Sequence, residues 1–376
     1  MKLSQAHIDD LEIEYISKML KSQKYFGMGQ EVQQFEKELK DYIGSEYLPV
    51  TCSTGTSALH LAAQSIGLGV GDEVLVPSIT YVASFQSIKA TGANPVACDI
   101  NIENGLIDLT DAKSRITKNT KAIMFVHYAS YFDNILEVYD FAKKYNLRVI
   151  EDAAHSFGNL YQGKKIGSFG DVICFSFDGI KNITCGEGGA IFSTDQKVLN
   201  KAKDLRLLGV EKDSDKRYEG KRSWEFDVKE QGWRYHLNNV SAAIGRAQLS
   251  KFDSVLAPKR KKIFNLYQTL LKDIPQINLF KSKDVKTESD IVNHILVVRV
   301  IDGSRDRLRN ILLENSIECG VHYYPNHLLT YFKTSYSLKN AEQFFREELT
   351  LPLHPNLEED DIVKVTNLIK KFYKEF

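Results

Sequence analysis

The sequence predicts an α/β protein with a mostly parallel sheet covered by helices on both faces, together with a smaller second domain. Three observations support this fold class. Apolar strand candidates alternate with helical patterns between residues 48 and 193. A chain of 376 residues can form one large α/β domain and a smaller one. The pattern changes near residue 250, so we expect a large domain over residues 1–250 and a small α+β domain over residues 251–376.

The first two elements are predicted to be helices. Apolar side chains recur at roughly helical spacing over residues 8–22 and again over residues 30–42, and Gly44 follows the second run as a stop signal. A short strand is expected next, over residues 48–52.

That strand runs directly into the sequence Ser53-Thr54-Gly55-Thr56-Ser57, and a good helical pattern follows. This order of strand, glycine- and hydroxyl-rich turn and helix is typical of anion-binding sites, because the free backbone N–H groups at the helix start point toward the anion. A simple N-cap by Ser53 or Thr56 explains the same residues equally well. Both interpretations stay open on this segment alone.

Strands and helices continue to alternate through the rest of the predicted large domain. The stretch 211–230 is rich in Lys, Asp and Glu and is predicted to be a long exposed loop or flap. Predicted strands cover residues 73–77, 95–100, 122–127, 148–152, 172–177 and 190–193, and predicted helices include residues 84–91 and 135–145.

The predicted small domain begins with a bridging helix around residues 250–272. A βαβ pattern and two closing helices are expected after it. These elements are a strand over residues 293–300, a helix over 305–314, a strand over 317–323, and helices over 339–349 and 358–375.

Composition and charge argue against several classes of function. A formal net charge of +0 provides no electrostatic case for nucleic acid or an anionic membrane. Five scattered cysteines without a Cys-x-x-Cys pair are typical of reduced core thiols and predict no zinc site. The N-terminus lacks an apolar signal core, and no stretch approaches a membrane span. We therefore expect a cytoplasmic protein with no metal, no nucleic-acid partner and no membrane partner.

One lysine, Lys181, stands between the predicted strands 172–177 and 190–193, with glycines on both sides. A lone lysine is most often a solvated surface charge. Here the buried flanks and the glycines favour the close approach of a ligand. A lysine held in a pocket can lose its proton and attack a carbonyl to form a Schiff base. A Walker phosphate loop is the rival interpretation, but its Gly-x-x-x-x-Gly-Lys-Ser/Thr order is absent.

The predicted strand 148–152 ends in Glu151 and Asp152, and His155 follows. Two acids at the carboxyl end of a buried strand are costly unless a ligand needs them. This edge of an open parallel sheet is where ligands bind. The structural alternative makes Asp152 an N-cap and His155 a satisfied core histidine.

Together these residues fit pyridoxal phosphate (PLP), which needs a lysine, a carboxylate for its ring nitrogen, an anion cradle and a flat group for its ring face. Lys181 supplies the first and Asp152 the second. The Gly55-Thr56-Ser57 turn with Ser176 supplies the cradle, and Tyr81 is the candidate for the ring face. Asp152 precedes Lys181 by 29 positions with one strand unit between, so both reach the same sheet edge.

These motifs resemble those of the DegT/DnrJ/EryC1/StrS family, the nucleotide-sugar aminotransferases of aspartate-aminotransferase fold type I. The lysine segment and Glu-Asp-Ala-Ala-His occur together and in the family's order. The resemblance implies a three-layer α/β/α fold, a PLP cofactor and a homodimer with shared active sites. Matching segments cover residues 53–63, 72–83, 121–127, 149–158, 176–190, 232–249 and 351–355.

The resemblance also implies roles for individual residues. Lys181 is similar to the lysine that carries the cofactor and moves a proton between the cofactor and the substrate. Asp152 resembles the partner of the ring nitrogen, His155 the residue near the ring hydroxyl and Tyr81 the stacking aromatic. The residues that resemble the phosphate contacts are Thr56, Ser57 and Ser176.

The sequence departs from the family pattern within residues 232–239, the segment that reaches the partner's active site in family members. Arg234 stands where the family commonly has an asparagine, and His236 where it has an arginine. Arg234 can bind the cofactor phosphate or face the diphosphate of a sugar nucleotide, and both roles stay open. The residues His322, Tyr323 and Tyr324 resemble the family's His-Tyr-Pro stretch near the sugar site.

The expected activity is transfer of an amino group to a keto-6-deoxy sugar linked to a nucleoside diphosphate, for amino-sugar and surface-glycan biosynthesis. Glutamate is the expected donor by resemblance. A sugar dehydratase of the same fold is one alternative, and Lys181 argues against it because those proteins resemble this chain with histidine at that position. A non-catalytic PLP-binding regulator is the other, and the set of Lys181, Asp152 and His155 argues against it because a sensor needs no proton shuttle.

Overall fold

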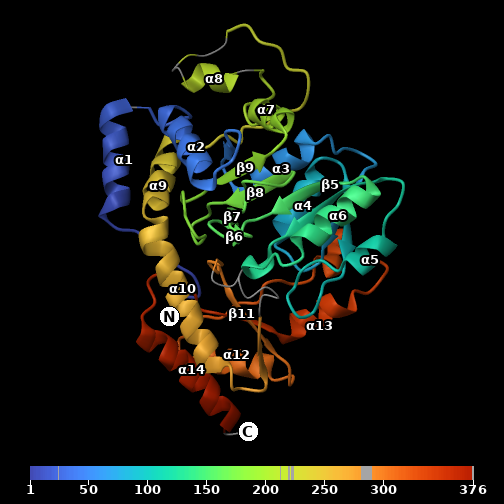
Figure 1. Ribbon diagram of the computed structural model, residues 1–376, viewed down its shortest axis with the longest axis vertical. Helices are drawn as coiled ribbons and strands as arrows, with labels where there is room; N and C mark the ends of the chain where they lie inside the picture. The colour runs from blue at the N-terminus through green and yellow to red at the C-terminus, as the bar shows by residue number, and fades with distance from the viewer. Residues whose placement is uncertain (24, 212, 219–220, 222–223, 281–289, 375–376) are drawn as a thin grey trace.

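The computed structural model describes residues 1–23, 25–211, 213–218, 221, 224–280 and 290–374 (Figure 1). Its larger part is built on a seven-stranded sheet with the strand order β1-β9-β8-β5-β4-β2-β3. Strand β9 pairs antiparallel with both of its neighbours, and the other pairs are parallel. The strands are β1 (Val50–Cys52), β2 (Glu73–Pro77), β3 (Asn94–Cys98), β4 (Thr120–Val126), β5 (Arg148–Asp152), β8 (Val172–Ser176) and β9 (Gly189–Ser193).

Helices cover both faces of this sheet. The connections β2–α4–β3 and β4–α6–β5 run in opposite directions across the sheet, so right-handed crossovers place α4 and α6 on opposite faces. Helix α3 packs against α4 and α7. The expected three-layer α/β/α arrangement is confirmed. The helices are α3 (Gly55–Ser65), α4 (Val82–Ala90), α5 (Leu109–Ser114), α6 (Ile135–Tyr145) and α7 (Gln196–Leu205).

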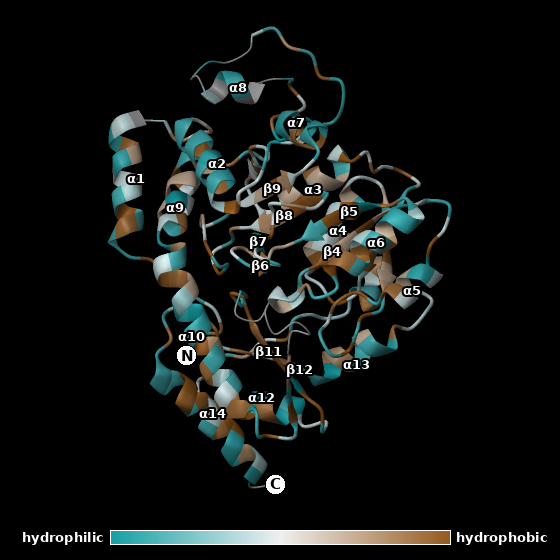
Figure 2. Cartoon of the chain, in the orientation of Figure 1, coloured by the Kyte–Doolittle hydropathy of each residue, from teal (hydrophilic) through white to brown (hydrophobic). Residues whose placement is uncertain are grey.

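The smaller part has its own apolar core around a three-stranded antiparallel sheet, visible as brown strands in Figure 2. The predicted strand over residues 317–323 is wrong, because there only Gly320 pairs, as an isolated bridge with Thr350. Beyond Gly320 the chain leaves the sheet. The third strand instead follows α13, so this part is not a βαβ unit. Its elements are β10 (Ile277–Leu279), β11 (Leu296–Val300), α12 (Arg305–Glu314), α13 (Lys339–Glu347), β12 (Glu348–Leu351) and α14 (Glu359–Lys374).

A nearly continuous helical segment connects the two parts. It consists of α9 (Asn239–Ser250), a π-helical turn (Phe252–Leu256) and α10 (Ala257–Leu271). Helices α1 (Asp10–Gln23) and α2 (Gln30–Ile43) pack against α9. The predicted domain boundary at residue 250 stays a prediction.

The predicted exposed loop over residues 211–230 is partly wrong, because the short helix α8 (Asp213–Tyr218) lies within it. Tyr218 is buried, its hydroxyl donates to Glu36 and it accepts a hydrogen bond from Arg206. One aromatic side chain therefore attaches this polar stretch to the core. Residues 212, 219–220 and 222–223 of this stretch lie outside the described residues. No helix within the described ranges is both long and apolar enough to cross a membrane.

Candidate active site

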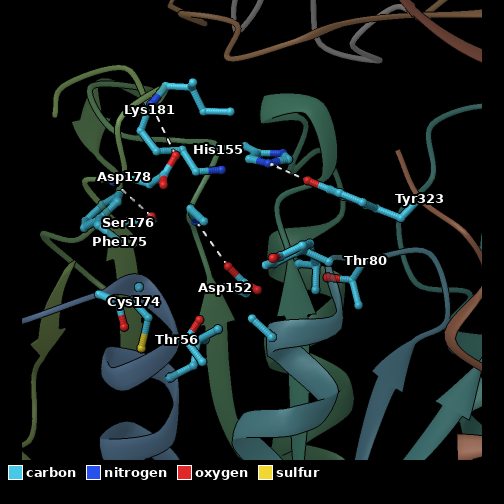
Figure 3. A pocket seen from close by; sticks show the side chains of 18 of the residues that line it. Thr56, Thr80, Asp152, His155, Cys174, Phe175, Ser176, Asp178, Lys181 and Tyr323 are labelled. Carbon is cyan, nitrogen blue, oxygen red and sulfur yellow. Dashed lines mark hydrogen bonds between the residues drawn. The ribbon is translucent and has the colours of Figure 1, made fainter. Parts of the chain in front are cut away.

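A cavity of about 450 Å³ opens at the carboxyl ends of β4, β5 and β8, beside the N-terminus of α3 (Figure 3). This is the sheet edge at which the sequence predicts a bound ligand. The segment after Gly320 closes one side of it. The cavity is lined by the predicted residues Gly55, Thr56, Tyr81, Asp152, His155, Ser176, Lys181, His322 and Tyr323.

Four predicted residues lie outside this lining. The hydroxyl of Ser57 accepts a hydrogen bond from Thr54 N at 3.0 Å, and Ser57 N donates to Thr54 Oγ1 at 3.0 Å. Thr54 is therefore the N-cap of α3, and Ser57 completes a capping box with it. The predicted cap residues Ser53 and Thr56 are wrong, and a phosphate contact of Ser57 stays a prediction. Tyr324 is 49% exposed and packs on Phe345. Arg234 is exposed and His236 bridges to Cys52, so any role of these two in a partner's site stays a prediction.

Lys181 follows a tight turn in which its backbone N–H donates to Asp178 O at 3.0 Å. Its amine lies 3.3 Å from Nε2 of His294. Burial lowers the pKa of Lys181 to about 8, although the charges of Asp152 and Asp178 oppose that shift. The amine is consequently neutral far more often at physiological pH than that of an ordinary lysine, as a nucleophile requires.

Asp152 ends β5 with its side chain held by hydrogen-bond donors. Ser84 Oγ donates to its Oδ2 at 2.7 Å, and Ala154 N donates to its Oδ1 at 3.3 Å. Thr80 Oγ1 lies 2.8 Å from Ser84 Oγ and extends the row. A buried carboxylate held in this way is suited to pair with a cationic group of a ligand.

The N-terminus of α3 and the end of β8 approach each other at the cavity floor. A Cβ atom built on Gly55 would lie only 2.7 Å from Ser176 Cβ. Glycine therefore permits the backbone of this first helical turn to reach the cavity beside the side chains of Thr56 and Ser176. Free N–H groups and two hydroxyls at a helix N-terminus form an anion-binding arrangement.

Aromatic and imidazole rings line the opposite wall. Tyr323 OH lies 3.2 Å from His155 Nε2, and the Tyr323 ring packs against Tyr81 with 5.8 Å between centroids. His322 is held by its N–H, which donates to Glu348 Oε2 at 2.8 Å. Burial lowers the pKa of His155 well below its usual range and that of His322 to about 4, so both rings are neutral at pH 7.

Several residues of the site were missed in the sequence analysis. Asp178 and Glu187 line the cavity and lie within the same glycine-rich run as Lys181, which was the available signal. Thr80 precedes α4 and Ser84 lies in its first turn, both close to Tyr81 in the sequence. His294 has no local signal, because 113 positions separate it from Lys181.

Comparison with known proteins decides the family. The profile of the DegT/DnrJ/EryC1/StrS aminotransferase family matches residues 6–370. The chain belongs to this family. The predicted resemblance is confirmed, and the expected fold type I is confirmed with it.

Relatives in the DegT/DnrJ/EryC1/StrS family carry amino-sugar names. The chain is 34% identical to the GDP-perosamine synthase of Escherichia coli O157:H7, over 97% of this chain and 96% of that one. It is 33% identical to the UDP-4-amino-4,6-dideoxy-N-acetyl-beta-L-altrosamine transaminase of Campylobacter jejuni, over 99% and 98%. The PLP form of Spr1654 from Streptococcus pneumoniae matches with a TM-score of 0.89 and 28% identity, over 100% and 99%. Aminotransferases of this family use PLP.

Proposed function

We propose that this aminotransferase moves an amino group from L-glutamate to a keto-6-deoxy sugar linked to a nucleoside diphosphate, with PLP as its cofactor. One observation carries the proposal: Lys181 and Asp152 line a single cavity beside the N-terminus of α3, where an anion can bind. The relatives named for GDP- and UDP-linked amino sugars support the substrate class. Amino-sugar and surface-glycan biosynthesis in the cytoplasm is the proposed setting.

The residues present fit the cofactor. Gly55, Thr56 and Ser176 would hold its phosphate, because a side chain at residue 55 would fill the cradle. Asp152 would hold the protonated ring nitrogen, and Lys181 would hold the aldehyde. When bound, PLP supplies a ring that withdraws electrons from the reacting carbon.

The chain's own groups supply the proton movements. Lys181, with its pKa lowered to about 8, can take a proton at Nζ and return it near neutral pH. Asp152 stays fixed during this exchange because Ser84 and Ala154 hold both of its oxygens. His155 and Tyr323 hydrogen-bond to each other at 3.2 Å, so each ring fixes the other at the cavity wall.

The substrate side of the cavity is formed by the chain after Gly320 and by Tyr81, which is 59% exposed. We propose that His322 and Tyr323 contact the sugar. We further propose a homodimer in which Arg234 and His236 reach the site of the partner subunit. The exposure of Arg234 is compatible with that role.

A half-reaction tests the proposal. Glutamate added to the PLP-loaded protein should remove its visible absorbance and release stoichiometric 2-oxoglutarate. A panel of 3-keto and 4-keto 6-deoxy sugar nucleotides should then restore the absorbance, and mass spectrometry should identify an amino sugar. Lys181→Ala is the control and should do neither.

Other outcomes contradict the proposal. A product that has lost water without gaining nitrogen would indicate the dehydratase alternative. Binding of PLP without any 2-oxoglutarate would indicate the regulator.

A further inference from the structure

His294 is a buried histidine in contact with the reactive lysine. It is 2% exposed and precedes β11, in the smaller part of the molecule. Its Nε2 lies 3.3 Å from Lys181 Nζ. Among the described residues, His294 is the only side chain that hydrogen-bonds to this amine. The contact therefore joins the segment before β11 to the loop between β8 and β9 that carries the lysine.

The backbone of His294 is held from two directions. Its N–H donates to Ser130 Oγ at 2.9 Å, and its carbonyl accepts from Arg260 Nη1 at 3.1 Å. Arg260 Nη2 also donates to Ile180 O at 3.4 Å, so one buried guanidinium holds both the histidine and the residue before the lysine. The imidazole itself packs on His155 with 4.6 Å between ring centroids. A side chain held in this way has a defined direction, which a mobile surface histidine lacks.

Burial is the main reason that this imidazole is neutral. Burial and the nearby positive charges of Lys181 and Arg260 hold the pKa of His294 well below its usual range. A neutral imidazole can accept a hydrogen bond through one ring nitrogen, whereas a lysine ammonium can only donate. At the 3.3 Å contact the lysine ammonium therefore donates to an uncharged imidazole, which does not repel it.

We propose, building on the proposed function, that His294 is a positioning residue for Lys181. Its neutral imidazole accepts a hydrogen bond from the lysine amine and holds that amine at the cavity wall whenever it is not joined to the cofactor. The lysine is free during each half of amino transfer and must return to the same place. A fixed acceptor reduces the number of conformations open to the lysine side chain and stabilises the protonated amine.

The test uses the full-length protein without cofactor and measures how fast PLP is captured, by visible absorbance, as a function of pH. Capture requires the neutral amine, so the midpoint of the profile reports the protonation of Lys181. The titratable and charged groups around this amine are Asp152, Asp178, Arg260, His155, His322 and His294.

His294→Leu removes the acceptor and should lower the midpoint by about one pH unit, because the ammonium loses its hydrogen bond. His294→Gln keeps an acceptor, so its midpoint should stay close to that of the wild-type protein. If the leucine variant does not fold, His294→Asn should give the same lowering, because its shorter amide does not reach the amine. His354→Leu is the matched control, since His354 is also buried in the smaller part and bonds instead to Lys2 O.

An unchanged midpoint in His294→Leu or His294→Asn would overturn the proposal, as would an equal shift in His354→Leu. In the loaded enzyme, His294→Leu should lower kcat about tenfold and leave KM for glutamate nearly unchanged, because the lysine acts after the donor binds. A wild-type protein that captures PLP with the expected midpoint but transfers no amino group contradicts the proposed function and leaves the contact with His294 intact.

Discussion

Ser84 donates a hydrogen bond to Asp152 at 2.7 Å and thereby joins helix α4 to the end of strand β5. Asp152 is only 6% exposed, so a partner for each oxygen matters energetically. Thr80 lies 2.8 Å from Ser84 and completes a row of hydroxyls behind the carboxylate. The orientation of the carboxylate is thus determined by α4 together with the strand that carries it.

Replacing Asp152 and Ser84 in turn should separate the effect of the carboxylate's charge from the effect of its orientation. Asp152→Asn keeps the size and a hydrogen-bond acceptor but loses the negative charge, and kcat should fall by about 10²–10⁴-fold. Ser84→Ala keeps the charge and removes one donor, and kcat should fall by about tenfold or less. Steady-state kinetics measure both. Equal losses in the two variants would contradict the separate roles assigned to charge and orientation.

Closing the anion cradle should weaken cofactor binding without unfolding the protein. Gly55→Ala places a methyl group 2.7 Å from Ser176 Cβ and 2.9 Å from its Oγ. The dissociation constant for PLP, measured by absorbance titration, should rise at least about tenfold, because the floor must move. Gly69→Ala is the control, since no heavy atom lies within 4 Å of its added methyl group. Unchanged PLP affinity in Gly55→Ala would place the phosphate elsewhere.

Lys181, which is half-buried, and Lys251, which is buried, should respond oppositely to the same substitution. Lys181 pays a burial penalty that lowers its pKa to about 8, from an ordinary 10.5. Lys181→Met should therefore raise the free energy of unfolding of the cofactor-free protein at pH 7 by about 2 kcal/mol, after discounting its partial exposure. Lys251 instead pairs with Glu12 at 2.7 Å. Lys251→Met should lower stability by about 3 kcal/mol, because it leaves a buried carboxylate uncompensated.

The gain in Lys181→Met should depend on pH in a defined direction. Between about pH 8 and 10.5 the native wild-type protein binds fewer protons than the unfolded chain, so its stability rises with pH across this window. The advantage of the methionine variant should then shrink and vanish above pH 10.5. Urea unfolding at several pH values measures it. If the stability difference between the methionine variant and the wild-type protein did not change with pH, the Lys181 amine would be solvated in the native state.

Glu348 should produce the opposite slope at lower pH. Burial raises its pKa to about 7 from an ordinary 4.5, while it accepts the backbone N–H of His322 at 2.8 Å. The native protein binds the extra proton between these pH values, so this residue lowers stability as pH rises from 4.5 to about 7. Glu348→Gln keeps an acceptor and should flatten that part of the stability profile.

The stability gain in Glu348→Gln at pH 8 should be up to about 3 kcal/mol. Glu359→Gln, at an exposed pair with Lys262, is the control and should change the profile little. A profile for Glu348→Gln that is parallel to wild type would show that the carboxyl is ionised throughout.

Local sequence patterns were sufficient for much of the large sheet and for part of the cavity. The predicted strands 73–77 and 148–152 coincide with β2 and β5, and the predicted helix 135–145 coincides with α6. Buried parallel strands are continuous apolar runs, and the polar residues at their ends stand out against them. Asp152 and Lys181 were recognisable for that reason.

The smaller part was harder to predict. Residues 317–323 have a strand-like composition, yet pairing is limited to Gly320 because the next residues turn toward the cavity. Strand β12 was missed because it follows α13 without a loop. Short apolar segments are compatible with several partners, and the selected partner depends on packing between distant elements.

Three chemical groups at the sheet edge can be identified from their neighbours along the chain: one lysine, one acid and a helix N-terminus. The side chains that surround these groups come from distant parts of the chain and follow from the folding of the whole molecule. The contacts of Lys181 with His294 and of Tyr323 with His155 join residues 113 and 168 positions apart. These residues lie in loops that meet only when the smaller part packs against the larger one, and no periodicity along the chain records that packing.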